Sequence, residues 1–588
     1  MTIPEAIEEY KKNIIESESL NESLFTKEDK DEWILALHKR AERMTELYLE
    51  NNKLLDYINE AILIVEGKEM DDTFEALYSL YQDGYDDAPL MMSILKRMED
   101  YYKKTNDYSK LIVAYSIHAY ECHEYISRLD PSIPLNMELY KGILNLKNHY
   151  QEIETPRIRW NIFINYFNVI VAAESIPGLS IEEVFAYLHE AEEFYHSDLV
   201  QEIDKDNEDI VILFDQIEKG FLVYAEMYED LGDSLKNEIF NRAYSFIDKK
   251  DFYKSDFLPF FAYNRCLFGK NEITKEELCH RFEIYFKPKI EKFFDQELTD
   301  EKIVGTFDAI GLLLKCLRLK GEANVSYYYG IIKKFFRAVI EKTNVEKPTP
   351  YVNAVIVDFV VNSLPFESNK EEIEQSLFDH LVRKQPPTYI HSVMVMKIAE
   401  IIYNHMDKSL LPKMDNPLEF IQNSALLHDI GKARLTDIIN MQRRRLSDTE
   451  FQGIRNHPVY GERILMESDL LKEYFDVIAG HHKWYDGTKG YPMDFDNTKS
   501  KYRIIIDLIT ISDCIDAATD RFGRNYKHPK SVKEVVEEFK IDKGTKYSPY
   551  FTELLEHDKD LIAELEVLTQ YKRPEYMYLA YIKGKIGK

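Results

Sequence analysis

Five histidines and two aspartates in the last third of the sequence are the side chains best suited to hold metal ions. A neutral imidazole and a carboxylate are the usual nitrogen and oxygen ligands of manganese, iron and zinc, and one carboxylate can bridge two such ions. A pair of metal ions in turn suggests hydrolysis. The seven residues are His391, His428, Asp429, His457, His481, His482 and Asp513.

Several of these residues share the apolar stripe of a predicted helix, which would turn them toward the protein interior. His391 precedes Met394 and Ile398 at helical spacing, and Asp513 follows Ile509 in the same manner. A carboxylate on a buried stripe is costly unless it is paired or bound to a metal. One inward histidine is more often a satisfied core residue than a ligand, but five histidines with two aspartates favour a metal site.

The local sequence also predicts where the helices around these residues begin and end. Gly431 predicts the end of the helix that carries His428. Pro458 directly follows His457, which predicts a helix that starts at this histidine, because proline is favoured in the first turn. Serine and glutamate at the two ends of the stretch 447–450 predict a capping box for the preceding helix.

The order of these motifs resembles the HD-GYP branch of the HD-domain metal-dependent phosphohydrolases. The resemblance covers roughly residues 370–560. It rests, in chain order, on His391, His428-Asp429-Ile-Gly-Lys432, Asn456-His457-Pro458, His481-His482, Asp486-Gly487, Gly490-Tyr491-Pro492 and Asp513.

The resemblance implies an all-helical domain with a binuclear iron or manganese centre that hydrolyses cyclic dinucleotides, typically cyclic di-GMP. Zinc, nickel or magnesium would be further possible metals. A water shared by two cations loses a proton near neutral pH and can attack phosphorus. By the resemblance, one ion would be held by His391, His428, Asp429 and Asp513, and the other by Asp429, His457, His481 and His482, with Asp429 as the bridge.

The same resemblance implies which residues would meet the substrate. Lys432 would lie beside the bridging water or the phosphate, and Arg521 and Arg524 would meet the substrate phosphates. Ordinary surface solvation explains the two arginines equally well. Tyr491 would flank a base or the pocket wall, or it would be a packing aromatic in a turn.

Four departures from the family pattern bear on the substrate and on the number of ions. Lys483 stands where family members usually carry glutamate, and the Gly-Tyr-Pro loop at 486–492 has one additional residue. The stretch 520–524 replaces the usual Arg-Pro-Tyr-Arg. Pro387 occupies the position of a glutamate that holds a third ion in some members, so we expect two metals. No primary ligand is lost, which favours altered specificity over lost activity.

Three functions therefore compete. The first is a metal-dependent phosphodiesterase that acts on a cyclic dinucleotide. The second is a phosphatase or nucleotidase on another phosphoester, suggested by Lys483 and Lys489 in the altered loop. The third is a catalytically silent scaffold that senses a nucleotide.

The chain divides into regions of different character, and the predicted fold class is all-α, with a helical-repeat or solenoid-like region followed by an all-helical hydrolase domain. The expected regions are a helical repeat-like regulatory or docking region at 1–345, a connector at 346–370, the hydrolase domain at 371–560, and a C-terminal helix with a basic tail at 561–588.

The first region weakly resembles tetratricopeptide repeats, in which a small residue lets two helices approach and an aromatic residue fills the neighbouring gap. The irregular spacing makes a helical solenoid or bundle the safer prediction. Such a region would bind a protein, a peptide or a second copy of the chain. The residues that fit the repeat are Ala225, Tyr228, Leu231, Gly232, Phe240 and Ala243.

Composition narrows the choice of partners and compartment. The chain has 588 residues, 45% of them hydrophobic, and a net charge of -29. A polyanion such as a nucleic acid or an anionic membrane would be repelled at long range. Five cysteines without a Cys-x-x-Cys spacing suggest thiols in a reducing compartment. With neither a secretion signal nor a long apolar run, we expect a cytoplasmic protein.

Overall fold

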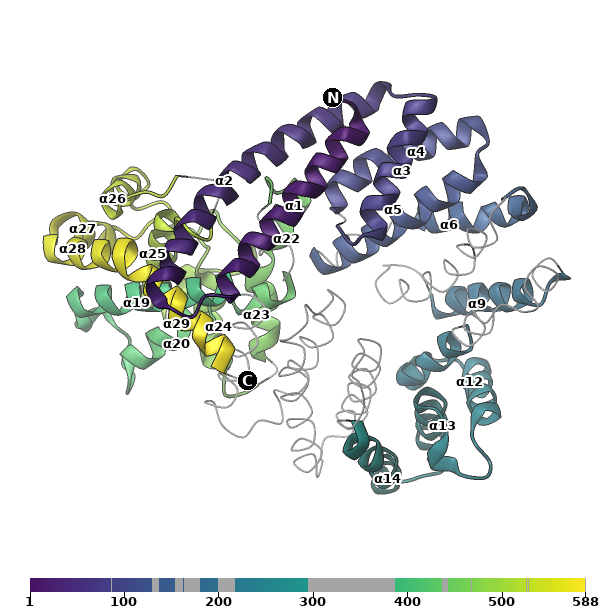
Figure 1. Cartoon of the computed structure of the whole chain (residues 1–588). Helices are drawn as coiled ribbons and strands as arrows, with labels where there is room; N and C mark the ends of the chain where they lie inside the picture. The colour runs from purple at the N-terminus through teal and green to yellow at the C-terminus, as the bar shows by residue number, and fades with distance from the viewer. Residues whose placement is uncertain are drawn as a thin grey trace. The chain divides into compact units, whose positions relative to one another are not determined.

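The computed structural model of the chain is all-α in the residues that it describes, as the sequence predicts (Figure 1). Within these residues there is no β-strand, and the only β-type pairings are two isolated bridges, one of which joins Lys483 to Gly490. The predicted connector at 346–370 lies outside them. Apart from single positions, the described ranges are 1–129, 137–153, 180–198, 217–293, 386–435 and 443–586.

The chain folds into two compact units. The first consists of Met1–Ile58 and Phe336–Lys588, and the second of Asn59–Phe335. The sequence assigned the first 58 residues to the N-terminal region, whereas the structure packs them with the C-terminal residues. The other predicted boundaries, and the tetratricopeptide character of the second unit, stay predictions.

The N-terminal residues join the first unit because their second helix has an apolar stripe that requires cover. Helix α1 (Ile3–Phe25) starts at a capping box made by Thr2 and Glu5, and α2 (Lys30–Ala61) returns beside it. The buried residues Trp33, Leu37 and Ala41 of α2 recur at helical spacing. They pack with Phe522 and with Met577, Tyr578 and Tyr581, which lie far along the chain.

The C-terminal part of the first unit is a set of short helices joined by tight turns. Helix α19 packs against α20 and α25, and α23 packs against η7 and α24. The elements are α19 (Pro386–His405), η6 (Lys408–Leu410), α20 (Pro417–Leu427), η7 (Ile430–Leu435), α22 (Asp448–Arg455), α23 (His457–Met466), η8 (Lys472–Tyr474), α24 (Phe475–Gly480), η9 (Asn497–Lys499), α25 (Arg503–Thr519), α26 (Val532–Ile541), α27 (Pro549–His557), α28 (Lys559–Glu566), η10 (Val567–Lys572) and α29 (Arg573–Ile586).

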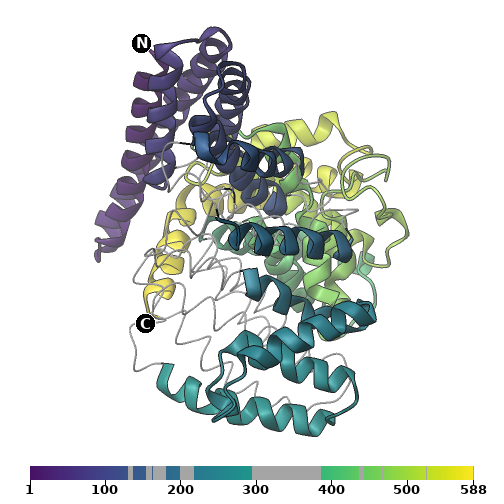
Figure 2. The ribbon, with the colours of Figure 1, turned by 90° about the vertical axis from the view of Figure 1, so that its right-hand side faces the viewer.

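The described part of the second unit is a series of helices in which neighbours along the chain pack together, as α4 with α5 and α12 with α13 (Figure 2). A β-carbon at Gly269 would lie 2.2 Å from the ring of Tyr228, so this glycine lets the two segments approach. The elements are η1 (Ile62–Ile64), α3 (Lys68–Gln82), α4 (Ala88–Thr105), α5 (Tyr108–Leu129), α6 (Met137–Asn145), η2 (Leu146–Glu152), α9 (Ile181–Tyr195), η3 (Tyr224–Asp230), α12 (Asp233–Phe246), η4 (Phe252–Lys254), α13 (Phe257–Gly269) and α14 (Lys275–Phe293).

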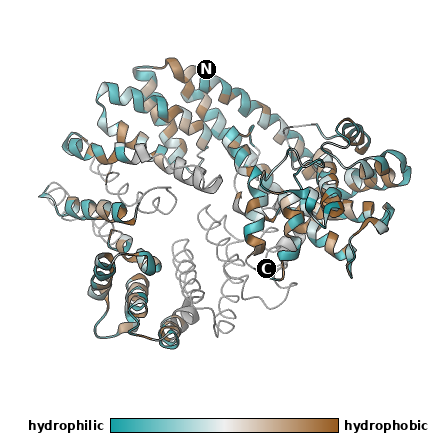
Figure 3. Cartoon of the chain, turned by 180° about the vertical axis from the view of Figure 1, so that it is seen from behind, coloured by the Kyte–Doolittle hydropathy of each residue, from teal (hydrophilic) through white to brown (hydrophobic). Residues whose placement is uncertain are grey.

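Hydrophobic and hydrophilic residues are mixed along the helices of both units (Figure 3). Among the described helices, none is both long enough and apolar enough to cross a bilayer. Of the cysteines whose side chains the structure describes, Cys266, Cys279 and Cys514 take no part in a disulfide bond.

The packing of α2 on the C-terminal residues leads to a prediction about stability. Trp33→Ala is expected to lower the free energy of unfolding by about 3–5 kcal/mol, because it removes a buried ring from the core and leaves a cavity. Trp33 is 3% exposed and its ring centroid lies 5.6 Å from that of Tyr578. Denaturant unfolding followed by circular dichroism measures the change.

Leu35→Ala is the matched control, because Leu35 lies on the same helix and is 57% exposed. It should leave the free energy of unfolding within about 0.5 kcal/mol of the original value. Equal effects of the two substitutions would contradict the packing of α2.

Candidate metal centre

The seven predicted ligands lie on five helices, or directly after them, and converge inside the first unit. His428, His457 and His481 are completely buried. The helix before His428 ends at Leu427, four residues earlier than Gly431, and the predicted capping box at Ser447 is present. In chain order, His391 lies in α19, His428 and Asp429 follow α20, His457 begins α23, His481 and His482 follow α24, and Asp513 lies in α25.

The ligand atoms fall into two groups, and within each group all of them lie within 4.8 Å of one another. The first group is Asp429, His457, His481 and His482, and the second is His391, His428 and Asp513.

Asp429 lies between the two groups and presents one carboxylate oxygen to each. Its Oδ1 atom is 3.1 Å from Nε2 of His457, and its Oδ2 atom is 3.3 Å from Nε2 of His391 and 3.4 Å from Nε2 of His428. This is the geometry that a bridging carboxylate needs. The two groups contain the residues that the resemblance implied for two ions, and the assignment of these residues as ligands stays a prediction.

The hydrogen bonds of three histidines define which ring nitrogen faces the centre. Nδ1 of His428, His457 and His481 each lies 2.6–2.7 Å from the backbone carbonyl oxygen three residues earlier. A carbonyl oxygen only accepts, so each Nδ1 carries the proton and each Nε2 keeps its lone pair. The Nε2 atoms of His457 and His481 are 3.1 Å apart, and two lone pairs at that distance repel unless a cation lies between them.

His391 is oriented by a carboxylate instead of a carbonyl group. Its Nδ1 atom lies 2.6 Å from Oδ2 of Asp516, and Asp516 in turn makes an ion pair of 2.6 Å with the buried Arg573. Burial alone would lower the pKa of His391, whereas hydrogen bonds to Asp513 and Asp516 raise it to about 9. A carboxylate behind a metal-binding imidazole fixes its orientation and increases its basicity.

The charges of the centre also suit a metal pair. Burial alone would raise the pKa of Asp429, but Lys432 and the neighbouring histidines hold it well below its usual range. Burial lowers the pKa of His481 strongly and that of His482 to about 3, so both rings are neutral. Oδ1 of Asp429 is buried without a hydrogen-bond partner. These donors fit divalent ions, which would neutralise the carboxylates and use the lone pairs.

Two glycines allow the backbone to bring the ligands together. A β-carbon at Gly431 would lie 1.9 Å from the carbonyl oxygen of His457, so only glycine lets η7 lie against α23. Gly490 has a φ of +87°, and its β-carbon would lie 2.2 Å from the carbonyl oxygen of His482. The Gly-Tyr-Pro loop is thus folded directly onto His482, a candidate ligand.

The predicted substrate residues are placed differently from one another. Tyr491 is half-buried and its ring centroid lies 4.6 Å from that of His482. Arg524 is half-buried; burial alone would lower its pKa, but Tyr526 and the carboxylates of Asp513 and Asp520 raise it. Arg521, in contrast, is exposed.

Two residues near the centre were missed from the sequence. The guanidinium group of Arg455 lies over the ring of Tyr491 at 5.9 Å, and its buried Nε has no hydrogen-bond partner. Arg455 stands two residues before His457, and this position was the sequence signal that could have placed it near the centre. Asp516 lies three residues after Asp513 on the same helix, and this helical spacing was its signal.

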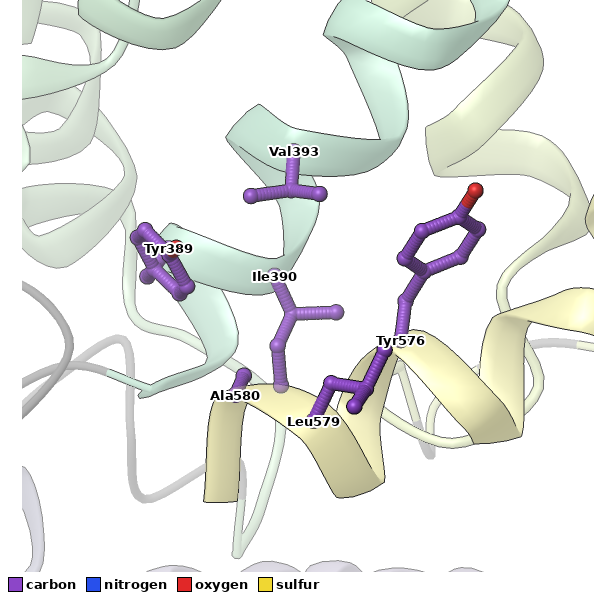
Figure 4. A pocket seen from close by; sticks show the side chains of 6 residues that line it. All are labelled: Tyr389, Ile390, Val393, Tyr576, Leu579 and Ala580. Atoms are coloured by element: carbon purple, nitrogen blue, oxygen red, sulfur yellow. The ribbon is translucent and has the colours of Figure 1, made fainter. Parts of the chain in front are cut away.

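A small apolar pocket lies elsewhere, between α19 and α29 (Figure 4). None of the seven ligands is among its lining residues. It is lined by Tyr389, Ile390, Val393, Tyr576, Leu579 and Ala580.

Comparison with known proteins places the seven candidate ligands in a known domain family. Residues 388–518 match the family model of the HD domain. The chain contains an HD domain. This confirms the resemblance to the HD-domain hydrolases, and all seven candidate ligands lie within the matched range.

The HD domain also has named relatives. The chain is 32% identical over 155 residues to a cyclic di-GMP phosphodiesterase of Thermotoga maritima, an alignment that covers 26% of this chain and 39% of that protein. It is 32% identical over 157 residues to a 3'3'-cGAMP-specific phosphodiesterase of Vibrio cholerae, covering 25% and 28% of the two chains. A cyclic di-GMP phosphodiesterase of Pseudomonas aeruginosa is 31% identical over 150 residues, covering 25% and 34%. The chain therefore spans less than two fifths of the length of these relatives.

The contact between His391 and Asp516 leads to a prediction about metal affinity. Asp516→Asn is expected to weaken metal binding by about 10–100-fold, because the amide cannot hold His391 as a carboxylate does. Titration of the metal-free protein with Mn²⁺, followed by calorimetry, measures the affinity.

Asp507→Asn is the matched control, since Asp507 is a buried carboxylate of the same helix that pairs with Arg503 rather than with a ligand. Its affinity for Mn²⁺ should be unchanged. If the Asp516→Asn variant and the unmodified protein bind Mn²⁺ with equal affinity, Asp516 does not support metal binding.

Proposed function

We propose that this chain is a metal-dependent phosphodiesterase that hydrolyses a cyclic dinucleotide at a centre of two divalent ions. The observation that carries the proposal is the position of Asp429, whose two oxygens face two separate groups of ligands. Iron and manganese suit this mixture of imidazole and carboxylate ligands best. The names of the relatives support the substrate class, because both cyclic di-GMP and 3'3'-cGAMP are cyclic dinucleotides.

The protein side chains would hold the ligands in place and bind the phosphodiester. When bound, two divalent ions would lower the pKa of a shared water, so that hydroxide becomes available for attack on phosphorus. Asp429 would bridge the ions, while the carbonyl-bonded histidines keep their Nε2 lone pairs directed inward. This arrangement needs no protein nucleophile.

Positive side chains around the centre would bind the phosphate oxygens. The ammonium group of Lys432 pairs with Oδ2 of Asp429, so it lies at the edge of the centre. Arg524 follows Asp513 by eleven residues along the chain, and Arg455 lies over Tyr491 beside His482. Charged hydrogen bonds to a phosphodiester are strong where water is excluded, which favours an anionic substrate here despite the net charge of -29.

Lys483 is the departure that bears most on the choice of substrate. It is only 4% exposed, and its backbone forms an isolated antiparallel β-bridge with Gly490 in the Gly-Tyr-Pro loop. A buried ammonium group adds positive charge where the family usually has a carboxylate. A phosphatase or nucleotidase acting on a smaller phosphoester is therefore the second candidate function.

The first test is product analysis with protein purified without oxygen. Incubation with cyclic di-GMP, 3'3'-cGAMP and a panel of mononucleotides should yield a linear dinucleotide or mononucleotides only from the cyclic substrates. Asp429→Ala should lose at least about 100-fold in activity together with its metal content, because the bridge between the ions is removed.

Elemental analysis and chromatography are the measurements. Release of inorganic phosphate from mononucleotides without cleavage of either cyclic dinucleotide would replace the proposal by the second candidate. Metal content and activity both retained in the Asp429→Ala variant would refute the bridging role.

A second test concerns Lys432. Lys432→Ala should lower kcat about 10²–10³-fold at full metal content, because a positive charge next to the reacting phosphate is lost. Lys489→Ala is the matched control, since Lys489 is an exposed lysine of the altered loop that lies over the ring of Trp484. Steady-state kinetics of the two variants decide, and an equal loss in both would show that only overall charge matters.

A further inference from the structure

The loop that carries Arg521 and Arg524 is in contact with the N-terminal helix α2. We define the arginine loop as residues 520–524, which follow directly after α25. The carboxylate of Asp520 accepts hydrogen bonds from the backbone N–H groups of Phe522, at 2.9 Å, and Gly523, at 3.1 Å. The loop is therefore a tight turn with its own internal hydrogen bonds, and its central side chain, Phe522, is 1% exposed.

Helix α2 contacts both the backbone and the side chain of Phe522 in this turn. Nη1 of Arg40 donates to the carbonyl oxygen of Phe522 at 3.2 Å, while Nε of Arg40 donates to Oδ1 of Asn21 at 2.6 Å. The ring of Phe522 packs with Trp33 and lies edge-on to His38, with centroids 5.0 Å apart. One guanidinium group thus joins α1, α2 and the arginine loop.

A second contact reaches Arg524 itself. Nη1 of Arg524 donates to the hydroxyl oxygen of Tyr526 at 3.1 Å, and the ring of Tyr526 lies 6.5 Å from that of Tyr48 on α2. Arg40 and Tyr48 are eight residues apart, close to two full helical turns, so they lie on the same face of α2.

The far end of α2 is fixed to another part of the same unit. Nδ2 of Asn51 donates to the carbonyl oxygen of Arg443 at 3.0 Å, and the backbone N–H of Arg445 donates to Oδ1 of Asn52 at 2.8 Å. Glu18 of α1 makes an ion pair of 2.9 Å with Arg443. Because α2 is anchored at a second place, it can act as a rigid support for the arginine loop.

We propose that α2 positions the arginine loop for substrate binding, with Arg40 as the positioning residue that holds Phe522 and so fixes the turn that carries Arg524, eleven residues after Asp513. This inference rests on the proposed function for its consequence in catalysis. Arg40 contacts neither the ligands nor their supporting carboxylate, so its loss should affect binding of the phosphodiester and leave the metals in place.

The test compares full-length, metal-loaded Arg40→Met with the unmodified protein. KM for cyclic di-GMP and 3'3'-cGAMP should rise about tenfold while kcat changes less than about threefold, because the loop then holds Arg524 less often in its binding position. Metal content should be unchanged. Hydrogen exchange should become at least tenfold faster at the amides of Phe522 and Gly523, and stay the same in α25.

Arg43→Met is the matched control, because Arg43 lies one turn further along α2 and pairs only with glutamates of α1 and α2 in the contacts described. It should leave both KM and the exchange of the loop unchanged. Asn21→Ala, which removes the other partner of Arg40, should raise KM by a smaller factor than Arg40→Met.

The possible results separate this inference from the proposed function. An unchanged KM or unchanged loop exchange in Arg40→Met overturns the inference, and so does a parallel loss of metal and kcat with faster exchange in α25, which would indicate a merely structural role. If the unmodified protein cleaves neither cyclic dinucleotide, the proposed function fails. In that case, hydrogen exchange at the amides of Phe522 and Gly523 is the measurement that shows whether α2 holds the loop.

Discussion

The first unit is constrained by a set of lone pairs that face one another in a largely buried space. Nε2 of His457 lies 3.1 Å from Nε2 of His481, and neither atom carries a proton when Nδ1 donates to a backbone carbonyl. Adding the buried carboxylates of Asp429 and Asp513 makes the space strongly electron-rich. Such an arrangement is unfavourable without cations, and binding of divalent ions is therefore linked to the stability of the fold.

The groups behind the ligands show that this arrangement is built into the helices themselves. The carbonyl oxygens that fix the histidines come from the last turns of α20, α22 and α24, where carbonyl groups have no partner within the helix. Each helix end thus gains a hydrogen bond as it orients a ligand. His391 lies inside α19, where no carbonyl is spare, and Asp516 with Arg573 takes the place of one.

The sequence singles out the candidate ligands because each is close to a strong local pattern. His391 and Asp513 lie on stripes of apolar residues, and the proline after His457 indicates the start of a helix. The missed features are those that depend on distant parts of the chain. The local sequence around Arg573 suggests an ordinary exposed basic residue. Only the packing of α29 makes it a buried partner of Asp516. The apolar stripe of α2 gives no information about which residues cover it.

The assignment of α2 to the same unit as the metal centre changes how the chain's organisation is understood. A boundary drawn from composition separates the first helices from the hydrolase, because their Glu, Lys and Leu content is like that of residues 59–335. Burial of Trp33 against Phe522 decides which unit α2 belongs to. An aromatic core contributes several kcal/mol to the free energy of folding, whereas a similar amino-acid composition contributes nothing. The helix that leads into the second unit is therefore also the helix that lies on the loop after the last ligand. The hydrogen bonds that orient the candidate ligands come from carbonyl groups and from Asp516 rather than from α2, so the contacts of α2 support the loop and not the histidines.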